Sequence, residues 1–409
     1  MLEKTGGGKE LRISVLYSHL TELGGAENVI LTQLKLLRKK GHKVKCHFAY
    51  VDEHLTEKSE NPHRFVENYL NLPLLKSESF NILLATPLAP FRASIFRGYD
   101  VLICHGYGPA LWMGYVSKKM NGTKYVSYIH CPPRFLYLSR EEKALWRFNK
   151  VRNLIYALSR VGWPIIKSVD FLSVVNSDGV LANSAFTAHR LKAIYGVEPT
   201  ICYPPVDTDI FRPLKSRKIE ELRSKFGWPL ILSTGRIVAI KRWEWLIEAM
   251  TYVTKVYPSA NLLITGGISS ENIGYVKKLV KMAVSFKVQK NIKFLGFQPL
   301  NKLVQLYNAA DVYAYAVPKE DFGLGPVEAM ACGTPAVVWN DGAGPCETVI
   351  DAKTGFKAHP YDIEDFAEKI LKAVDIEKSK IIDFACDYVK NNFSIHKHLD
   401  ILESELKRI

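Results

Sequence analysis

The sequence predicts an α/β protein with two domains, each built around a parallel β-sheet that helices cover on both faces. The chain has 409 residues, which is too long for one hydrophobic core and favours two domains of about 200 residues each. Short apolar runs alternate with segments of helical spacing, as expected for sheets buried on both faces. Near the middle, Tyr203-Pro204-Pro205 interrupts this alternation, because two prolines stiffen the chain.

The apolar runs fall into two sets, which predicts one domain over residues 1–205 and a second over residues 206–389. The first set contains the expected strands Arg12–Tyr17, Val44–Tyr50, Val101–Cys104 and Tyr125–Ile129. The second contains the expected strands Ile231–Thr234, Leu262–Thr265, Ile292–Leu295, Val312–Ala316 and Ala336–Trp339. The segments Trp243–Val256 and Asn301–Ala309 have helical spacing, and a charged helical segment at about 390–409 could pack back on the first domain. In such sheets, ligands bind beyond the carboxyl ends of the strands.

Composition indicates a globular protein with an uneven positive charge. Apolar residues make up 47% and charged residues 23%, and the net charge is +14. Residues 1–205 hold 27 Lys and Arg against 16 Asp and Glu, whereas residues 206–409 hold 28 against 25. This asymmetry suggests an anionic partner such as a membrane lipid, a phosphorylated substrate or nucleic acid, or simply a generally basic proteome. Nucleic acid is disfavoured, because no nucleic-acid module or interleaving of basic and aromatic residues is present.

The cysteines and apolar segments bear on the compartment. Seven scattered cysteines without metal-ligand spacing favour a reduced, cytoplasmic setting. The segment Met1–Glu10 lacks the apolar core of a signal peptide, and no apolar run is long enough to cross a bilayer. Residues Arg140–Lys167 mix basic, aromatic and aliphatic residues, which fits either a membrane-surface helix or a domain helix with a solvated basic face. We expect peripheral attachment to the inner face of an anionic membrane.

The most informative segment lies between Glu320 and Glu328, directly after the expected strand Val312–Ala316. Gly323 and its neighbour at 325 permit a tight turn and a close approach of a ligand to the backbone. Pro326 suits the first position of a helix, which would place Glu328 in the first helical turn. Amides at such a turn can bind phosphate or sugar oxygens. Local physics alone fits equally well an ordinary strand–loop–helix connection, in which Glu328 only caps the helix.

Three further segments follow expected strands. Arg236 and Lys241 lie five residues apart in the loop after Ile231–Thr234 and could converge on one diphosphate, whereas Arg242 fits a solvated surface cation. Gly24-Gly25 leads from the first strand into a helix and could let a phosphate approach, although a Gly pair is more often just a turn. His130 ends a strand and precedes two prolines, so it could contact a reacting group or be structural.

In their order and spacing, these four segments resemble the retaining nucleotide-sugar glycosyltransferases of family 4, which have the GT-B fold of two Rossmann-like domains facing each other across a cleft. Glu320 and Glu328 fit the family's E-x7-E motif, and Arg236 with Lys241 fits its diphosphate clamp. The segment that begins with His130 resembles a mannosyltransferase subgroup. The resemblance therefore implies transfer of a hexose, mannose from GDP-mannose in the first instance, to a lipid-linked or polysaccharide-precursor glycan.

The resemblance also implies contacts to the phosphates and the nucleotide. Arg236 and Lys241 would bind the donor diphosphate and stabilise it as it leaves, and Gly25 would close over the phosphates from the first domain. Glu328 would accept hydrogen bonds from the ribose hydroxyls. Phe297, within Gly296-Phe297-Gln298, would lie beside the nucleotide base.

At the sugar, the resemblance assigns Glu320 to the donor hydroxyls and His130 to the reacting centre. The backbone amides of Phe322, Gly323 and Leu324 would orient the sugar and the phosphate. The implied mechanism is a front-face displacement with retained configuration, in which the leaving diphosphate takes the acceptor proton. Such a reaction needs stabilisation of the leaving phosphate more than a protein nucleophile.

Several alternatives remain open at this point. Two nearby carboxylates also suit a glycosidase, but Arg236 and Lys241 would have no role in one. A nucleotide-sugar epimerase or a non-catalytic nucleotide-sugar binding protein would use much of the same donor site. Asp207-Thr208-Asp209 matches a three-residue metal-binding pattern that arises often by chance, so we expect no metal and no cofactor.

Overall fold

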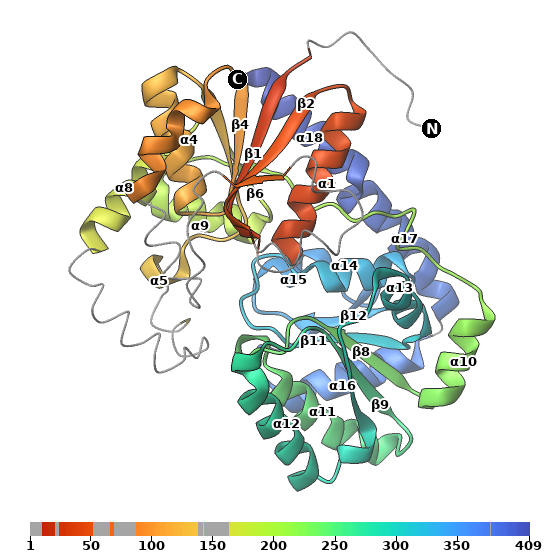
Figure 1. Ribbon diagram of the computed structural model, residues 1–409. Coiled ribbons are helices and arrows are strands. Elements are labelled where there is room, and N and C mark those ends of the chain that lie inside the picture. Colours follow the sequence, from red (N-terminus) through yellow and green to blue (C-terminus); the bar gives the residue numbers. More distant parts are fainter. Residues whose placement is uncertain are drawn as a thin grey trace. The chain divides into compact units, whose positions relative to one another are not determined.

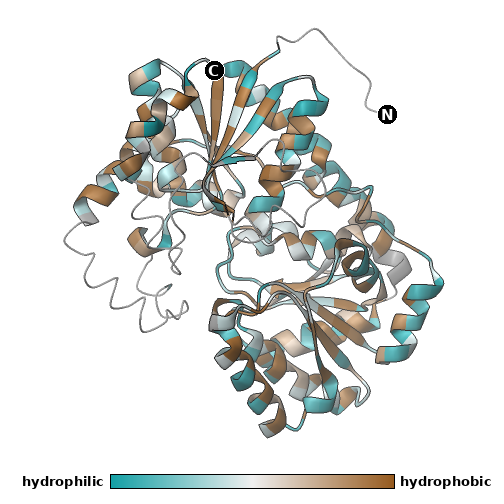
Figure 2. Cartoon of the chain, in the orientation of Figure 1, coloured by the Kyte–Doolittle hydropathy of each residue, from teal (hydrophilic) through white to brown (hydrophobic). Residues whose placement is uncertain are grey.

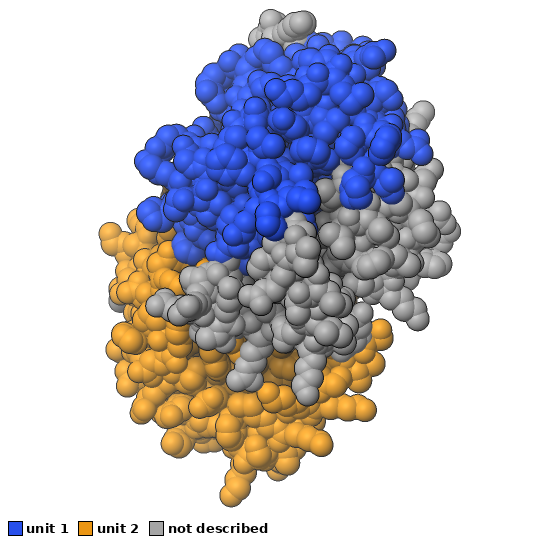
Figure 3. Space-filling view, turned by 90° about the vertical axis from the view of Figure 1, so that its left-hand side faces the viewer, with its two compact units in different colours: residues 1–139, 148–205, 395–409 blue, residues 140–147, 206–394 orange. Residues whose placement is uncertain are grey.

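The computed structural model describes residues 10–20, 24–51, 66–68, 87–137, 142, 163–376 and 378–409. The chain divides into two compact units, coloured separately in Figure 3. Unit 1 comprises residues 1–139, 148–205 and 395–409, and unit 2 comprises residues 140–147 and 206–394. Each unit is built around its own parallel sheet, as the sequence predicts.

Unit 1 has a seven-stranded parallel sheet with the order β3-β2-β1-β4-β5-β6-β7 (Figure 1). Its strands are β1 (Arg12–Leu20), β2 (Lys43–Val51), β3 (Val66–Asn68), β4 (Val101–His105), β5 (Lys124–Ile129), β6 (Gly179–Ala182) and β7 (Thr200–Ile201). The strand order reverses direction between β1 and β4. The central strand β4 is buried at all five positions and begins with four apolar residues, because both of its faces are covered, and it appears largely brown in Figure 2.

Helices from distant parts of the sequence cover the two faces of this sheet. One face packs against α1 (Gly25–Lys39) and α18 (Ile395–Arg408), which lie side by side although they are the first and last α-helices of the described chain (Figure 1). The other face packs against η2 (Ala89–Phe96), α4 (Pro109–Asn121), α8 (Trp163–Val175) and α9 (Ala185–Tyr195). The short helix α5 (Arg134–Tyr137) follows β5.

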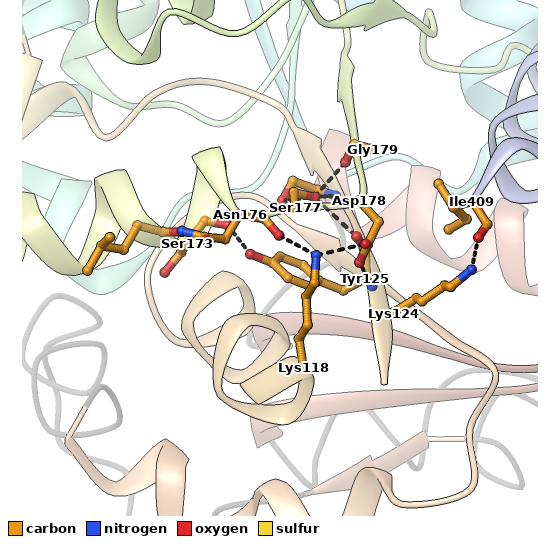
Figure 4. Close-up of polar contacts among 11 residues, drawn as sticks. Lys118, Lys124, Tyr125, Ser173, Asn176, Ser177, Asp178, Gly179 and Ile409 are labelled. Atoms are coloured by element: carbon orange, nitrogen blue, oxygen red, sulfur yellow. Dashed lines mark hydrogen bonds and ion pairs between the residues drawn. The ribbon is translucent and has the colours of Figure 1, made fainter. Parts of the chain in front are cut away.

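A cluster of polar contacts joins α4, α8 and the amino ends of β5 and β6 (Figure 4). Lys118 of α4 donates to the Asp178 carboxylate over 2.7 Å and to the Asn176 carbonyl over 2.8 Å. The same carboxylate accepts from the backbone N–H of Tyr125 over 3.0 Å, and the Tyr125 hydroxyl donates to the Ser173 carbonyl over 2.7 Å. Hydrogen bonds thereby satisfy these polar groups at the amino ends of the strands.

Unit 2 has a six-stranded parallel sheet with the order β10-β9-β8-β11-β12-β13. Its strands are β8 (Leu230–Thr234), β9 (Asn261–Thr265), β10 (Ile292–Gly296), β11 (Val312–Tyr315), β12 (Ala336–Trp339) and β13 (Gly355–Ala358). One face packs against α11 (Trp243–Val256), α12 (Ile273–Ser285) and α16 (Ile363–Asp375). The remaining helices are α10 (Arg217–Phe226), α13 (Leu300–Ala309), α14 (Leu324–Ala331), α15 (Gly344–Thr348) and α17 (Lys378–Phe393).

All nine strands expected from apolar runs are present, with bounds that differ by at most three residues. The expected helices Trp243–Val256 and Asn301–Ala309 correspond to α11 and α13. Sequence reasoning missed β6 and β13, which are four residues long and contain Gly, and it missed the short edge strands β3 and β7. Strands this short give too few residues for a recognisable pattern.

The carboxyl ends of β8 and β9 approach each other so closely that one position excludes a side chain. A Cβ at Gly266, whose φ is +156°, would lie 1.8 Å from the carbonyl oxygen of Gly235. The Gly235 N–H in turn donates to the carbonyl of Thr265 over 2.9 Å. The loop that carries Arg236 therefore rests on a glycine contact with the neighbouring strand.

We expect Gly266→Ala to lower the melting temperature of the chain, because the new methyl group must displace the 235–236 backbone. Overpacking of this kind costs about 1–3 kcal/mol or more. The matched control is Gly267→Ala, since a Cβ at Gly267 meets nothing within 4 Å. Scanning calorimetry of both variants checks the prediction, and equal melting temperatures would contradict it.

Candidate functional site

The candidate site in unit 2 lies where β8 and β11 run side by side. Val312 and Tyr313 of β11 pair with Ile231 and Leu232 of β8, so both strands end at the same edge of the sheet. The strand order reverses between them, and the connections that follow them lead away in opposite directions. Open parallel sheets bind ligands at such a point. The loop after β8 carries Arg236 and Lys241, and the loop after β11 carries Glu320.

Lys241, Glu320 and Tyr315 form a closed polar triangle at this edge. The Lys241 ammonium donates to Glu320 Oε2 over 2.7 Å and to the Tyr315 hydroxyl over 3.0 Å. The Tyr315 hydroxyl donates to the same Glu320 oxygen over 3.0 Å. The side chains of Lys241 and Glu320 are each 20% exposed. The structure therefore joins two predicted site residues that are 79 positions apart in a charge-assisted contact.

Arg236 lies in the same loop as Lys241, and its side chain is exposed. The backbone at this position is fixed, since the Arg236 carbonyl accepts hydrogen bonds from the Trp243 indole N–H over 3.1 Å and from the Val238 N–H over 2.9 Å. Lys241 ends the short helix η4 (Ala239–Lys241). A rigid backbone thus presents both cations from one loop.

The expectation that Arg242 is a solvated surface cation is wrong. Arg242 is only 5% exposed, and its guanidinium lies 5.0 Å from the centre of the Trp245 ring. It also lies 3.5 Å from the Glu244 carboxylate. Arg242 adopts a left-handed conformation with φ of 54° immediately before α11, which directs the chain back onto the core.

The helix after the Gly-rich turn begins earlier than the sequence predicts. Gly323 has φ of 80° and precedes α14, whose first residue is Leu324, so Pro326 is the third helical residue rather than the first. Glu328 is then the fifth residue and lies beyond the first turn. The reason is that Gly323 supplies the left-handed turn itself, and Pro326 still fits because first-turn N–H groups have no partner within the helix.

Glu328 belongs to a network of buried hydroxyl groups. The Tyr307 hydroxyl donates to Glu328 Oε2 over 2.7 Å and lies 3.1 Å from the Thr234 hydroxyl, which in turn lies 2.9 Å from the Tyr313 hydroxyl. Burial raises the pKa of the Glu328 carboxyl above its usual value, and the Tyr307 hydrogen bond partly offsets this rise. Glu328 is therefore held by Tyr307 of α13, which Thr234 of β8 supports in turn, and a carboxylate keeps lone pairs for further donors.

The turn between the two carboxylates requires glycine at two positions. A Cβ at Gly325 would lie 2.0 Å from the Tyr313 hydroxyl oxygen, so α14 begins directly against the buried network. Phe322 is 3% exposed and packs against Phe393, with 5.9 Å between ring centres. This packing anchors the turn, while Gly323 and Leu324 are more exposed. Backbone amides at the start of such a helix suit an anion.

Phe297 lies after β10 at the same edge of the sheet and is 72% exposed. The preceding residue, Gly296, has a left-handed φ of 67°, and the Gln298 amide donates to the Leu295 carbonyl over 2.7 Å. A fixed turn therefore presents a large aromatic ring to solvent, which is how stacking surfaces are built.

The other predicted site residues, Gly25 and His130, belong to unit 1. Gly25 is the first residue of α1, and the Gly24 N–H donates to the Glu27 carboxylate over 3.0 Å. The preceding Thr21–Leu23 lies outside the described residues. His130 directly follows β5 and is partly exposed, and its Nε2 lies 3.0 Å from His105 Nδ1. Burial lowers the pKa of His130 to about 3, so the imidazole is neutral near pH 7.

Sequence reasoning missed the tyrosines that hold the two carboxylates. Tyr315 contacts Glu320 and Lys241, Tyr307 contacts Glu328, and Tyr313 completes the network. The available signal was the alternation of Tyr313 and Tyr315 in the strand directly before Glu320. It was hidden because β11 is buried throughout and reads as a continuous apolar run.

The acidic pattern at Asp207 forms a local turn. The Asp207 carboxylate accepts a hydrogen bond from the Asp209 N–H over 3.0 Å, and its carbonyl accepts from the N–H groups of Ile210 and Phe211. Within the described part of the chain, no three His, Cys, Asp or Glu side chains are grouped as a metal site would require.

Family comparisons match both halves of the chain. The sequence model described as Glycosyltransferase Family 4 matches residues 23–210, and the one described as Glycosyl transferases group 1 matches residues 215–383. The chain is 27% identical to a D-inositol 3-phosphate glycosyltransferase of Mycobacteroides abscessus, over 88% of this chain and 81% of that one. It is 30% identical to the enzyme of the same name from Mycolicibacterium smegmatis, over 56% of this chain, and spans about half (53%) of that relative's length.

Solved structures show a similar fold. The Anabaena protein Alr3699/HepE, crystallised in complex with UDP, matches with a TM-score of 0.75 and 22% identity, over 98% of this chain and all of that one. Sucrose-phosphate synthase from Thermosynechococcus elongatus matches with a TM-score of 0.77 and 19% identity, over 97% and 98% of the two chains. These likenesses confirm the α/β GT-B fold that the sequence predicts.

Proposed function

Because the chain belongs to glycosyltransferase family 4, we propose that it is a retaining enzyme that transfers a hexose from a nucleotide-diphosphate donor to a glycan acceptor. One observation supports this proposal above all others. Lys241, Glu320 and Tyr315 form a polar triangle at the reversal point of the unit 2 sheet, and the loop that supplies Lys241 also carries Arg236. Two cations suit a diphosphate, and a carboxylate beside them suits sugar hydroxyls.

The donor would occupy the carboxyl edge of the unit 2 sheet. Arg236 and Lys241 bind the diphosphate, and the amides of Phe322–Leu324 orient the sugar and phosphate oxygens. Glu328 accepts from the ribose hydroxyls, and the exposed ring of Phe297 stacks on the base. The predicted contacts of Gly25 with the phosphates and of His130 with the sugar come from unit 1.

The chemistry follows from the contact between Lys241 and Glu320. Before the donor binds, the carboxylate 2.7 Å away neutralises the ammonium. A diphosphate then competes for Lys241, and Glu320 becomes available to the sugar hydroxyls. As the sugar–phosphate bond breaks, negative charge grows on the diphosphate and is met by cations already in place. The acceptor hydroxyl attacks from the same face, its proton passes to the leaving phosphate, and configuration is retained.

We propose two candidate donors and one class of acceptor. GDP-mannose is the first donor to test, because the segment from His130 resembles mannosyltransferases. A UDP-sugar is the second, because Alr3699/HepE was crystallised with UDP. The proposed acceptor is a lipid-linked or polysaccharide-precursor glycan, which would place the enzyme at a membrane surface. No cofactor or metal enters the proposal.

The face of unit 1 that η2, α4 and α8 form supports attachment to an anionic membrane. The helices η2, α4 and α8 pack together and expose the apolar side chains Phe91, Met120 and Ile165, which are 81%, 62% and 71% exposed. Lys119 and Lys167 are exposed on the same helices. Apolar and cationic side chains together suit a surface of anionic lipid.

Most of the amphipathic segment expected at Arg140–Lys167 lies outside the described residues. Its last five residues, 163–167, begin α8. In the part of the chain that the structure describes, no helix is both long and apolar enough to cross a bilayer.

A donor panel tests the proposed function. We expect release of the nucleoside diphosphate from one of GDP-mannose, UDP-glucose or an ADP-sugar, accelerated by a glycan acceptor and insensitive to EDTA.

We expect Arg236→Ala and Lys241→Ala each to lower kcat/KM roughly 100-fold or more, because each removes a donor to the developing charge. Arg217→Ala, at a 91% exposed side chain on α10, is the matched control. Turnover without any acceptor product would favour an epimerase, and near-normal turnover by both clamp variants would contradict the diphosphate assignment.

Glu320 and Glu328 should affect different kinetic constants. We expect Glu320→Gln to lower kcat roughly 100-fold while donor affinity is kept or improved, because the Lys241 ammonium is released for the diphosphate. We expect Glu328→Gln to weaken donor binding about tenfold or more, since a hydrogen bond to a charged group contributes ~1.5–3 kcal/mol. Calorimetric titration with a nucleoside diphosphate and steady-state kinetics separate the two. The division is wrong if Glu320→Gln damages donor affinity far more than Glu328→Gln does.

Flotation with liposomes tests the membrane surface. We expect the chain to float with anionic vesicles at low salt and to dissociate at high salt, because salt screens the lysine charges. Phe91→Ser combined with Ile165→Ser should weaken flotation. The matched control replaces Ile273 and Phe384, exposed apolar residues of unit 2, by Ser. Absence of binding to anionic vesicles at low salt would refute the proposed surface.

A further inference from the structure

A row of four polar side chains crosses unit 1 between the carboxyl ends of its strands and the C-terminal helix. Gln33 of α1 and His105 of β4 are fully buried, and His398 of α18 is 2% exposed. His130, the fourth member, is partly exposed. Unpaired polar groups in such surroundings would cost several kcal/mol each, so their pairing needs an explanation.

Hydrogen bonds join the four side chains in a single file. His398 Nδ1 lies 2.6 Å from the Tyr203 carbonyl, and its Nε2 lies 3.0 Å from Gln33 Nε2. Gln33 Oε1 lies 2.9 Å from His105 Nε2, and His105 Nδ1 lies 3.0 Å from His130 Nε2. The three links between side chains have the length of ordinary hydrogen bonds, and the link to the Tyr203 carbonyl is slightly shorter.

The chemistry of the first link fixes the direction of all the others. A carbonyl can only accept, so His398 carries its proton on Nδ1 and offers a lone pair on Nε2. The Gln33 amide NH₂ therefore donates to His398, and its oxygen accepts from His105 Nε2–H. The lone pair of His105 is then on Nδ1, and it accepts from His130 Nε2–H. The opposite orientation of the Gln33 amide would set a lone pair of His398 against the Tyr203 carbonyl.

These hydrogen-bond directions require neutral imidazoles, and burial keeps the imidazoles neutral. Burial lowers the pKa of His398 to about 4 and that of His130 to about 3, and it lowers the pKa of His105 well below its usual value. The neighbouring imidazoles lower the His105 pKa further. Near pH 7 each ring thus has one donor and one acceptor, as the file demands.

We propose that Gln33, His105 and His398 are positioning residues that hold His130 as its Nε2–H tautomer, so that Nδ1 presents a lone pair to a substrate hydroxyl. The benefit of this arrangement to transfer rests on the proposed function of His130 at the donor sugar. The tautomer of His130 does not depend on the proposed function, because it follows from the Tyr203 carbonyl and the three other side chains. Apolar side chains in place of Gln33, His105 and His398 would pack as well, but they would leave the His130 proton free to occupy either nitrogen.

Nuclear magnetic resonance of the full chain with ¹⁵N-labelled histidine tests the tautomers directly. Long-range proton–nitrogen correlations separate protonated from bare ring nitrogens, and single His→Gln variants assign the signals. We expect protons on Nε2 of His130 and His105 and on Nδ1 of His398. A proton on Nδ1 of His130, or an equal mixture of its tautomers, would overturn the proposal.

Two substitutions of Gln33 distinguish positioning from packing. Gln33→Glu keeps an acceptor for His105 and, because burial favours the neutral carboxylic acid, a donor for His398, so the His130 tautomer and kcat should be retained. Gln33→Met fits the apolar surroundings but removes the acceptor, so the His130 tautomers should mix. The kcat should then fall roughly 10- to 100-fold, as when a second partner of a functional histidine is lost, with KM for the donor nearly unchanged.

The matched control is Leu37→Met, a buried position one turn further along α1. It should change neither the spectrum nor kcat. A packing role predicts the reverse order, in which Gln33→Glu is the more harmful change because a carboxyl group costs more to bury than a thioether, and that result would overturn the proposal. If the unaltered chain transfers no sugar from any donor, the proposed function fails, while the His130 spectrum still decides the tautomer.

Discussion

The chemistry proposed for unit 2 depends on the pairing of β8 with β11. These strands lie side by side but belong to the two halves of the sheet, so the loops that follow them part at their carboxyl ends. The register of this pair brings Lys241 to Glu320, and Tyr315 at the end of β11 locks the two together. The absence of a side chain at Gly266 and Gly325 allows the Gly235 backbone and the Tyr313 hydroxyl to approach these positions closely. The site is rigid because the sheet edge is rigid.

The sequence was sufficient to predict the longer strands and the residue types at their ends, but not the short strands β3, β6, β7 and β13. Continuous apolar runs identify buried parallel strands, and parallel strands place their following loops at one edge. What it could not predict was contact between loops. The pairing of Lys241 with Glu320 depends on strand register across 79 positions, and the Tyr307 hydroxyl reaches Glu328 from a different helix. Local rules also misplaced Arg242 and the start of α14, because a residue with positive φ redirected the chain in both cases.

The two units pair their buried polar side chains in different ways. In unit 2 a cation and a carboxylate neutralise each other, so an incoming anion can exchange one partner for another. In unit 1 the file from His398 to His130 carries no net charge, and its members are satisfied by the direction of their hydrogen bonds alone. A charge pair responds to a charged ligand, whereas a neutral file of fixed direction resists change. The first arrangement suits a group that must release its partner during a reaction, and the second suits a group whose proton must stay in place.

The origin of the neutral file lies at the connections between the units. The chain enters unit 2 at Val206 and leaves it at Ser394, and these residues are bridged in parallel, with the Val206 N–H donating to the Phe393 carbonyl over 2.8 Å. Tyr203 and His398 lie just outside this bridge, on opposite connections, and the hydrogen bond between them spans 195 positions of sequence. The file therefore begins at the point where these two crossings of the chain are joined. Since one backbone carbonyl there sets the direction of every later hydrogen bond, the protonation of His130 is determined by backbone geometry rather than by a charged neighbour.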